Sequence, residues 1–308
     1  MDNAAGNGHL DVVRFLHDHR REGCNEDAMA KAAANGHLDM ILFLMDHRLV
    51  CIDKAGSALS GAVKNGHVEV VKFFLGLPVK SEPRDWFDYI RESCHEGHVA
   101  IVQVLWVYGD APRSHACLHL ETAARRGHLD IVRFFIEQNR VEKVEQGLVA
   151  AATNGHLEIV KFLVEHNFIE QVQHAAQEAA SNGHLYIVKY LVERGLDIDL
   201  EPAFIAAAKN GHLSVVKYCG CQGATKAMYE AAKHSHEHVV RFIMEQNALG
   251  SREELMDAAR KGHSDCVQYL SDHRPLFHGT PVYAIPTDWL IRPQALCRYL
   301  DTLSTPSA

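Results

Sequence analysis

The sequence lacks the long apolar segment and the concentrated charge that would place it at a membrane or on nucleic acid. No apolar run reaches the roughly 18 residues of a membrane-spanning helix. The net charge is −8, and the sequence contains no block of like charges. We therefore expect neither nucleic-acid binding nor binding to an anionic membrane, since both need a concentrated basic surface.

The sequence also lacks the features of a secreted protein. Residues 1–6 have neither the basic start nor the apolar stretch of a signal peptide. The eight cysteines share no common spacing, which argues against a disulfide framework. We expect an intracellular protein in the cytoplasm, with the nucleus as the alternative.

Catalytic motifs are missing as well. There is no glycine-rich phosphate loop, no Gly-x-Ser-x-Gly and no pair of carboxylates in a shared context. His115 and His119 lie four residues apart, but the glutamate of a His-Glu-x-x-His zinc motif is absent. We predict a protein that is not an enzyme and needs no cofactor.

What the sequence does contain is a repeat marked by the dipeptide Gly-His. The dipeptide stands at residues 8/9, 36/37, 66/67, 97/98, 127/128, 155/156, 183/184, 211/212 and 262/263, and Ser235-His236 is a tenth, altered copy. Successive histidines are 24 to 31 residues apart. Self-similarity of this kind predicts a stacked repeat array, in which each repeat buries its apolar face against its neighbours.

The residues after each histidine predict a helix. Counting from the histidine, positions +1, +3, +4, +6 and +7 are apolar in most copies, which indicates a helix with a wide apolar face. Position +2 is often acidic and position +5 often basic. The acid suits the first turn of the helix, and pairing with the base three residues later adds a little stability.

The residues before each histidine predict a second helix. Position −8 is mostly large and apolar, and positions −5 and −4 are mostly Ala-Ala, which allows neighbouring helices to approach closely. Asp27, Ser57 and Asp88 are expected N-caps of this helix in three of the repeats. Asn-Gly is expected to end it, because both residues tolerate the left-handed conformation of a C-cap.

This order of residues resembles the ankyrin repeat, and the resemblance covers residues 1 to about 272. No copy has the Thr-Pro-Leu-His motif, and the period is nearer 28 than the usual 33 residues. The missing residues fall in the loop that forms the β-hairpin finger of ankyrins. The array therefore resembles the degenerate, short-fingered ankyrin arrays of protists and giant viruses. The resemblance implies an all-α solenoid of about ten helix pairs that binds another protein, and we expect a monomer.

The expected domain boundaries are 1–272 for the repeat array and 273–308 for a C-terminal segment. Five of the nine prolines lie in the last 38 residues, and residues 293–300 suggest a short helix. A repeat array needs a capping element with a polar outer face, which is the simpler interpretation of this segment. Recruitment of a second protein is the alternative. Because the chain begins inside the first helix of the first repeat, either that helix is short or the chain is part of a longer protein.

The repeated histidines are expected to hydrogen-bond to the backbone rather than to bind metal. Helices pack 8–10 Å apart, whereas zinc needs its ligand nitrogens at about 2 Å. His234, His236 and His238 form a local cluster, and a metal-dependent protein or enzyme using them is the alternative function. Alternating side chains point apart, so we predict no metal site there.

A binding site for the partner is predicted where repeats depart from their siblings without losing core residues. The loop of residues 76–85 is longer than elsewhere and leads into aromatic residues, and the fifth repeat carries two arginines before its glycine. Trp, Tyr and Arg are enriched at interface hot spots. The predicted partner-binding residues are Arg84, Trp86, Phe87, Tyr89, Arg125 and Arg126. The alternative for Trp86 and Phe87 is that they fill a gap left by the longer loop.

Overall fold

The computed structural model describes residues 1–20, 26–50, 55–77, 83–108, 115–138, 144–220 and 224–247, and these residues form helices and turns without a strand. This confirms the all-α prediction. The chain divides into two compact units, residues 1–147 and 148–308. The tenth repeat at Gly262 and His263, and the expected C-terminal cap at 273–308, lie outside the described residues. Within the described part, no helix is long and apolar enough to cross a membrane.

The helices come in pairs, one before and one after each repeat histidine. The first unit contains α1 (Asp2–Gly6), α2 (Leu10–His19), α3 (Glu26–Ala34), α4 (Leu38–Asp46), α5 (Ala55–Lys64), α6 (Val68–Leu75), α7 (Pro83–Glu96), α8 (Val99–Tyr108), α9 (Ala116–Arg126) and α10 (Leu129–Glu137). Helix α11 (Glu145–Thr153) begins at the end of this unit. The second unit contains α12 (Leu157–Glu165), α13 (Val172–Ser181), α14 (Leu185–Glu193), α15 (Leu200–Lys209), α16 (Leu213–Cys219), α17 (Ala224–Lys233) and α18 (Glu237–Asn247).

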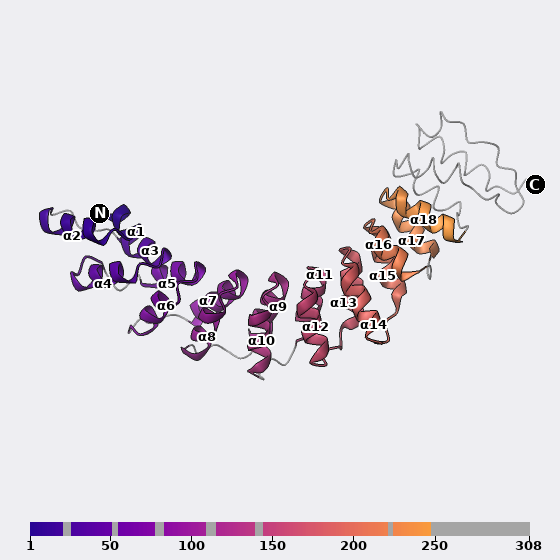
Figure 1. Cartoon of the computed structure of the whole chain (residues 1–308), viewed down its shortest axis with the longest axis horizontal. Helices are drawn as coiled ribbons and strands as arrows, with labels where there is room; N and C mark the ends of the chain where they lie inside the picture. The colour runs from indigo at the N-terminus through magenta and orange to yellow at the C-terminus, as the bar shows by residue number, and fades with distance from the viewer. Residues whose placement is uncertain are drawn as a thin grey trace, which may run out of the picture. The chain divides into compact units, whose positions relative to one another are not determined.

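Within each unit the helices form two layers. In the first unit the odd-numbered helices α1, α3, α5, α7 and α9 pack each against the next, and α6, α8 and α10 do the same beside them. In the second unit, α13, α15 and α17 form one layer, and α12, α14, α16 and α18 form the other. Figure 1 shows this pairing of labelled helices. We call the helix before each repeat histidine the first helix of its repeat, and the helix after it the second helix. Within a unit, the first helices therefore form one continuous face and the second helices form another.

The core of each pair uses a narrower face than the sequence suggests. In the sixth repeat Ile159, Val160 and Leu163 are 0–1% exposed, and they occupy positions +3, +4 and +7. Leu157 and Phe162, at +1 and +6, are only half-buried. The predicted apolar face is present, but its side chains at +1 and +6 lie at the edges and remain partly exposed.

The second helices begin where the sequence predicts. Nine of them start at the residue directly after the repeat histidine, from α2 to α18. Examples of the predicted pairing between +2 and +5 are Lys72 to Glu69 at 2.8 Å and Lys161 to Glu158 at 2.7 Å. All four side chains are substantially exposed, so each pair contributes a few tenths of a kcal/mol.

The first helices begin earlier than the sequence suggests. Asp27, Ser57 and Asp88 lie inside α3, α5 and α7, so the prediction that they are N-caps was wrong. Helix α7 starts at Pro83, a residue that suits the first helical position because its fixed φ is already helical and its missing N–H has no partner there. The described N-cap that accepts a hydrogen bond is Asp199, from the backbone N–H of Glu201 at 2.9 Å.

In the turn between the two helices of a repeat, the asparagine and the glycine end the first helix in different ways. Asn182 ends α13 with φ −104°, and its side-chain amide donates to the carbonyl of Glu178 at 2.9 Å. Gly183 alone adopts the left-handed conformation, with φ +78°. The prediction that Asn-Gly ends the helix is confirmed; the glycine supplies the left-handed residue, and the asparagine caps a helix carbonyl with its side chain.

The repeat histidine joins its own repeat to the preceding one. The Nε2–H of His212 donates to the carbonyl of Ser181 at 3.0 Å. The same ring covers Gly183, where an added Cβ would lie 2.7 Å from its Nδ1. Equivalent bonds run from His67 to Ala34, His98 to Lys64, His128 to His95 and His184 to Thr153. The prediction of a backbone hydrogen bond is confirmed, and the structure adds that its acceptor lies in the neighbouring repeat.

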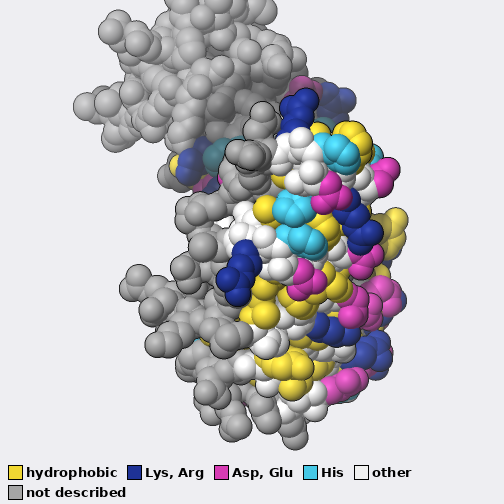
Figure 2. Space-filling view, turned by 90° about the vertical axis from the view of Figure 1, so that its left-hand side faces the viewer, with side chains coloured by type: hydrophobic (Ala, Val, Ile, Leu, Met, Phe, Trp, Pro, Cys, Tyr) yellow, Lys and Arg dark blue, Asp and Glu magenta, His cyan; other side chains and the backbone are white. Residues whose placement is uncertain are grey.

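A second histidine ends several of the second helices. Phenylalanine at +6 and histidine at +10 place their rings 4.1–4.2 Å apart, and the histidine Nδ1–H donates to the phenylalanine carbonyl. The pairs are Phe15–His19, Phe43–His47 and Phe162–His166. Figure 2 shows histidine side chains beside hydrophobic ones at the surface. Each histidine thus caps a carbonyl in the last turn of its helix and covers part of the phenylalanine ring.

The altered ninth repeat predicts a stabilising substitution. Ser235 stands where other repeats have glycine and has φ +63°. A residue with a Cβ in this conformation costs about 1–2 kcal/mol. We expect Ser235→Gly to slow hydrogen exchange in α17 and α18 by stabilising them by about 1 kcal/mol. As a control, Ser214→Gly inside α16 should destabilise instead, and equal effects of the two changes would contradict the strain.

Candidate functional site

A groove crosses the face made by the first helices of repeats four and five. Its volume is about 410 Å³, and it lies over α7 and α9. The residues that line it are Arg91, Glu92, His95, Thr122, Arg125 and Arg126. The structure therefore brings the two predicted arginines of the fifth repeat together with a third arginine and a histidine from the fourth.

The arginines of the groove are held by neighbouring carboxylates. Arg91 pairs with Asp88 at 3.0 Å, and Arg125 pairs with Glu121 one helical turn away. Because Arg91, Asp88 and Arg125 are 55–59% exposed, these pairs add little stability, but they restrict where the guanidinium groups point. The groove is thus rich in arginine but close to balanced in charge.

Arg126 is joined to the fourth repeat through a histidine. The Nδ1–H of His95 donates to the Glu96 carboxylate at 2.8 Å, and the other ring nitrogen faces the guanidinium of Arg126. This hydrogen bond lowers the pKa of Glu96, and the charges of His95, Arg126 and His98 lower it further. The carbonyl of His95 also accepts from His128 at 3.1 Å. His95 therefore fixes one wall of the groove to the other.

The predicted aromatic residues lie at the start of α7 and do not line this groove. Trp86, Phe87 and Tyr89 belong to the helix itself, which corrects the expectation that they precede it. Trp86 is half-buried. Tyr89 is 8% exposed and donates from its hydroxyl to the carbonyl of Gly56 at 3.2 Å, so it packs against the third repeat. The side chain of Arg84 lies outside the described residues.

Phe87 belongs to a cluster of aromatic and histidine rings between repeats four and five. Its ring lies 5.1 Å from that of His115 and 4.9 Å from that of His119. Phe135 lies 6.3 Å from His119 and 5.2 Å from Trp106. The cluster thus joins α7, α8, α9 and α10. This arrangement supports the alternative that Phe87 fills space left by the longer loop.

His119 is the buried ionisable group of this cluster. It is 2% exposed. Burial, together with smaller contributions from the charges of His115 and Arg91, lowers its pKa to about 4. Within the described residues its Nδ1 has no hydrogen-bond partner, and neither do His115 Nδ1 and Trp106 Nε1. The imidazole is therefore neutral at physiological pH.

His119 was noted in the sequence only for its spacing from His115, whereas the sign of its burial is position −9 of the repeats. The residue there is a buried alanine in five copies, namely Ala28, Ala58, Ala175, Ala203 and Ala227. In repeats four and five it is Tyr89 and His119 instead. Two large side chains in a column of alanines are the signal that marks this part of the core as different.

The histidines of repeat nine have structural partners. The Nε2–H of His238 donates to the carbonyl of Gly211 at 2.9 Å, and His236 hydrogen-bonds to the backbone of Lys209. The rings of His234 and His236 are 6.5 Å apart. In the part of the chain that the structure describes, no group of three or more His, Cys, Asp or Glu residues is arranged to hold a metal ion. Two of the three rings thus connect repeat nine to repeat eight.

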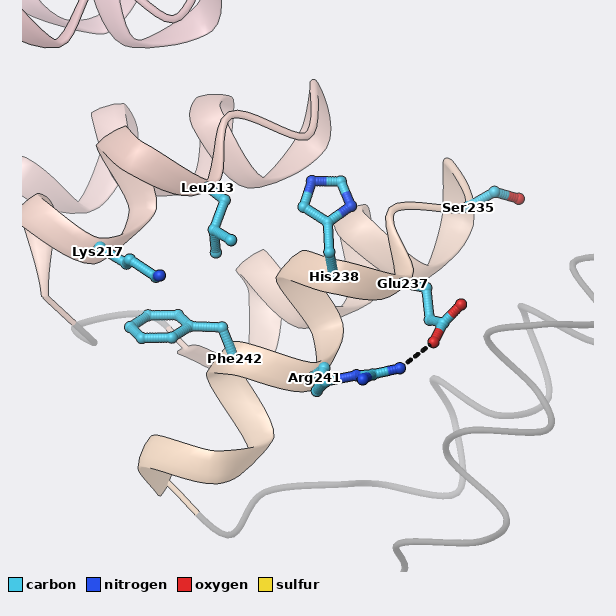
Figure 3. Close-up of a pocket in the computed structure, with 7 residues that line it drawn as sticks. All are labelled: Leu213, Lys217, Ser235, Glu237, His238, Arg241 and Phe242. Carbon is cyan, nitrogen blue, oxygen red and sulfur yellow. Dashed lines mark hydrogen bonds and ion pairs between the residues drawn. The ribbon is translucent and has the colours of Figure 1, made fainter.

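A pocket of about 600 Å³ lies beside these histidines on the second-helix layer. Its lining residues are Leu213, Lys217, Ser235, Glu237, His238, Arg241 and Phe242. Figure 3 shows the Arg241 guanidinium turned toward the Glu237 carboxylate, at 2.5 Å. Lys217 lies over the Phe242 ring, 5.6 Å from its centre. Arg241 and Glu237 therefore interact with each other, and so do Lys217 and Phe242.

Comparison with known proteins agrees with the repeat architecture. A family model described as ankyrin repeats (3 copies) matches residues 1–84, 120–202 and 204–278. The stretch it does not match before residue 120 includes α7 and α8, where the longer helix and the aromatic residues depart from the pattern. No curated protein matches the chain. Ankyrin repeats are generally protein–protein interaction modules. Since the matched segments cover most of the sequence, the chain belongs to the ankyrin-repeat family.

Proposed function

We propose that this protein is a non-catalytic scaffold or adaptor whose partner binds in the groove over α7 and α9. The observation that carries the proposal is the groove of about 410 Å³ lined by three arginines from two adjacent repeats. Arg125 and Arg126 are its central contacts. Arg84, Trp86 and Phe87 belong to the first turn and a half of α7 beside this groove, and we include them in the proposed site, while the buried Tyr89 packs under α7.

The charge pattern of the groove indicates what kind of segment fits. Asp88, Glu92, Glu96 and Glu121 balance much of the positive charge, so a polyacidic segment would be repelled as well as attracted. A mainly apolar segment with one acidic side chain can pair with an arginine without meeting the carboxylates. Such a pair contributes mostly to the rate of association and its dependence on salt.

Changing the arginines should weaken partner binding without unfolding the protein. Once a partner has been identified by affinity purification, we expect Arg125→Glu to weaken binding by about 2 kcal/mol, and Trp86→Ala to have an effect of similar size. Titration calorimetry at two salt concentrations would measure both effects.

The matched control is Arg133→Glu, which makes the same change on α10 in the other layer of the fifth repeat. It should leave the affinity unchanged. Folding of each variant would be checked by circular dichroism. Folded Arg125→Glu and Trp86→Ala variants that bind as tightly as the wild type would place the site elsewhere.

The compartment and the assembly state are proposed from the buried thiols and from the packing of the helix layers. Cys94 and Cys219 are buried thiols, and burial raises the pKa of Cys219 to about 11. Thiols kept protonated in the core suit a reducing environment. We therefore place the protein inside the cell, and as a monomer, because the layers of each unit already bury their apolar faces within the chain.

A further inference from the structure

The pocket over α16 and α18 has its origin in one residue of the ninth repeat. Position +1 is Leu or Val in the eight preceding repeats, from Leu10 to Leu213, but it is Glu237 in the ninth. Figure 3 shows the Glu237 side chain turned toward Arg241 and away from Leu213. The space that a leucine at +1 would occupy beside Leu213 is therefore open, and it forms part of the pocket of about 600 Å³.

The lysine of this pocket lacks the carboxylate partner that other repeats provide. In the third repeat, Lys72 at +5 pairs with Glu69 at +2. In the eighth repeat position +2 is Ser214, and Lys217 at +5 makes no ion pair with a residue that the structure describes. The Lys217 ammonium group lies instead over the ring of Phe242, 5.6 Å from its centre. A ligand can therefore pair with this ammonium group without breaking an existing ion pair, which removes one cost of binding.

The other charged side chains of the pocket balance each other. The Arg241 guanidinium pairs with the Glu237 carboxylate at 2.5 Å. The Nε2–H of His238 donates to the carbonyl of Gly211 at 2.9 Å, which fixes the imidazole ring at the edge of the pocket. Two positive side chains thus stand against one negative side chain, and the uncompensated charge is that of Lys217.

Apolar side chains lie beside this charge. Leu213 and Phe242 line the pocket, and both are half-buried. Figure 3 shows both side chains next to Lys217. Pockets for small molecules usually have volumes of about 300–1,000 Å³ and combine apolar walls with a few polar groups that orient the ligand. This pocket has both features, with one positive group next to an apolar surface.

We propose that the pocket over α16 and α18 binds a monocarboxylate with a short apolar chain. The carboxylate pairs with Lys217, and the chain lies on Leu213 and Phe242 in the space left by the missing leucine. Glu237 disfavours a ligand with a second negative charge. A free acid and the C-terminal residue of a peptide share this chemistry. The site lies on the second-helix layer of the second unit, so it does not depend on the groove over α7 and α9.

The first test compares simple probes by the amide chemical shifts of the full chain. Hexanoate should give saturable shifts in α16 and α18. Hexanol should bind about fivefold more weakly, because it lacks the charge that pairs with Lys217. Acetate should bind about tenfold more weakly, because it lacks the chain that covers Leu213 and Phe242. Equal affinities for hexanoate and hexanol, or no saturable shifts in these two helices, would overturn the proposal.

A peptide probe distinguishes the two sources of the carboxylate. Acetyl-Ala-Leu with a free C-terminus should bind more tightly than the same peptide with a C-terminal amide. A free peptide that binds more tightly than hexanoate would identify the ligand as the end of a peptide, whereas weaker binding would identify it as a free acid. Equal affinities of the free and amidated peptides would contradict the role of the carboxylate.

Two substitutions of Glu237 test whether the open space is the site. Glu237→Leu restores the residue of the other repeats and should abolish saturable hexanoate binding, because the leucine fills the space. Glu237→Ala also removes the carboxylate but leaves the space open, so it should bind hexanoate about threefold more tightly. Circular dichroism would confirm that both variants are folded. Equal hexanoate affinities of the two folded variants would refute the pocket as the site.

A matched pair of lysine substitutions tests the charge. Lys217→Met keeps most of the apolar stem but removes the ammonium group, so hexanoate and hexanol should bind equally well. Lys189→Met is the control, because Lys189 lies over Tyr218 at the same 5.6 Å in the preceding repeat and does not line the pocket. It should keep the fivefold preference for hexanoate. The same preference in Lys217→Met would show that Lys217 does not hold the carboxylate and would overturn the proposal.

Discussion

Replacing Gly183 by alanine is expected to lower the free energy of unfolding by about 3 kcal/mol, because the change acts on two repeats at once. The residue has φ +78°, a conformation that disfavours any residue with a Cβ. The new Cβ would also lie 2.7 Å from the Nδ1 of His212 in the next repeat. Moving that ring breaks its hydrogen bond to Ser181 and leaves the carbonyl without its partner.

The chain offers a matched control for the conformational part of this effect. Gly195 has φ +72°, and an added Cβ would meet nothing within 4 Å. Gly195→Ala should therefore cost only the strain, about 1–2 kcal/mol. Urea denaturation followed by circular dichroism would compare the two variants. Equal losses would show that the histidine ring does not depend on the glycine beneath it.

A double substitution separates the ring from the backbone. His212→Ala removes the imidazole and its bond to Ser181, so adding Gly183→Ala to that variant should cost no more than Gly195→Ala does. If Gly183 and His212 contributed independently, the double variant would lose the sum of the two single losses in free energy of unfolding. That result would contradict the contact between the repeats.

The sequence predicts most of the structure of one repeat, but not how that repeat is connected to its neighbour. The spacing of the Gly-His dipeptide predicts two helices and a turn, and the regular histidine predicts a backbone hydrogen bond. Which carbonyl accepts it cannot be read from one repeat, because the acceptor lies some 30 residues earlier in the chain. Because the histidine occurs at the same position in every copy, the sequence does not distinguish a contact within a repeat from a contact between two repeats.

The candidate site was predictable only in part, and for a physical reason. Arg125 and Arg126 stood out because they are two adjacent positive charges where most repeats carry at most one, and they do line a groove. Reading Asp88 as an N-cap placed Phe87 before the helix, whereas Pro83 begins the helix a turn earlier and turns Phe87 toward His119. Helix starts depend on a balance of small capping energies, so the face on which a nearby side chain lies is hard to predict.

Lowering the pH from 7 to 4.5 is expected to destabilise repeats four and five by about 2 kcal/mol through His119 alone. The pKa of His119 is about 4 in the folded protein because the ring is buried, whereas its ordinary value is 6.5. Between these two values the unfolded chain binds a proton that the folded protein does not, so stability is full above pH 6.5 and falls as the pH decreases. The loss approaches its limit of about 3 kcal/mol near pH 4, since each pKa unit corresponds to about 1.4 kcal/mol.

Other groups also titrate in this range, so the measurement must compare two proteins at two pH values. His119→Leu keeps a buried side chain of similar size but cannot be protonated. Its free energy of unfolding should fall by about 2 kcal/mol less than that of the wild type between pH 7 and pH 4.5, because all other ionisable groups are shared. Tryptophan fluorescence would follow the transition, since Trp106 lies 5.2 Å from Phe135 in the same cluster. An equal fall in both proteins would mean that His119 is protonated in the folded state, and that the cluster admits a charge or water which its burial excludes.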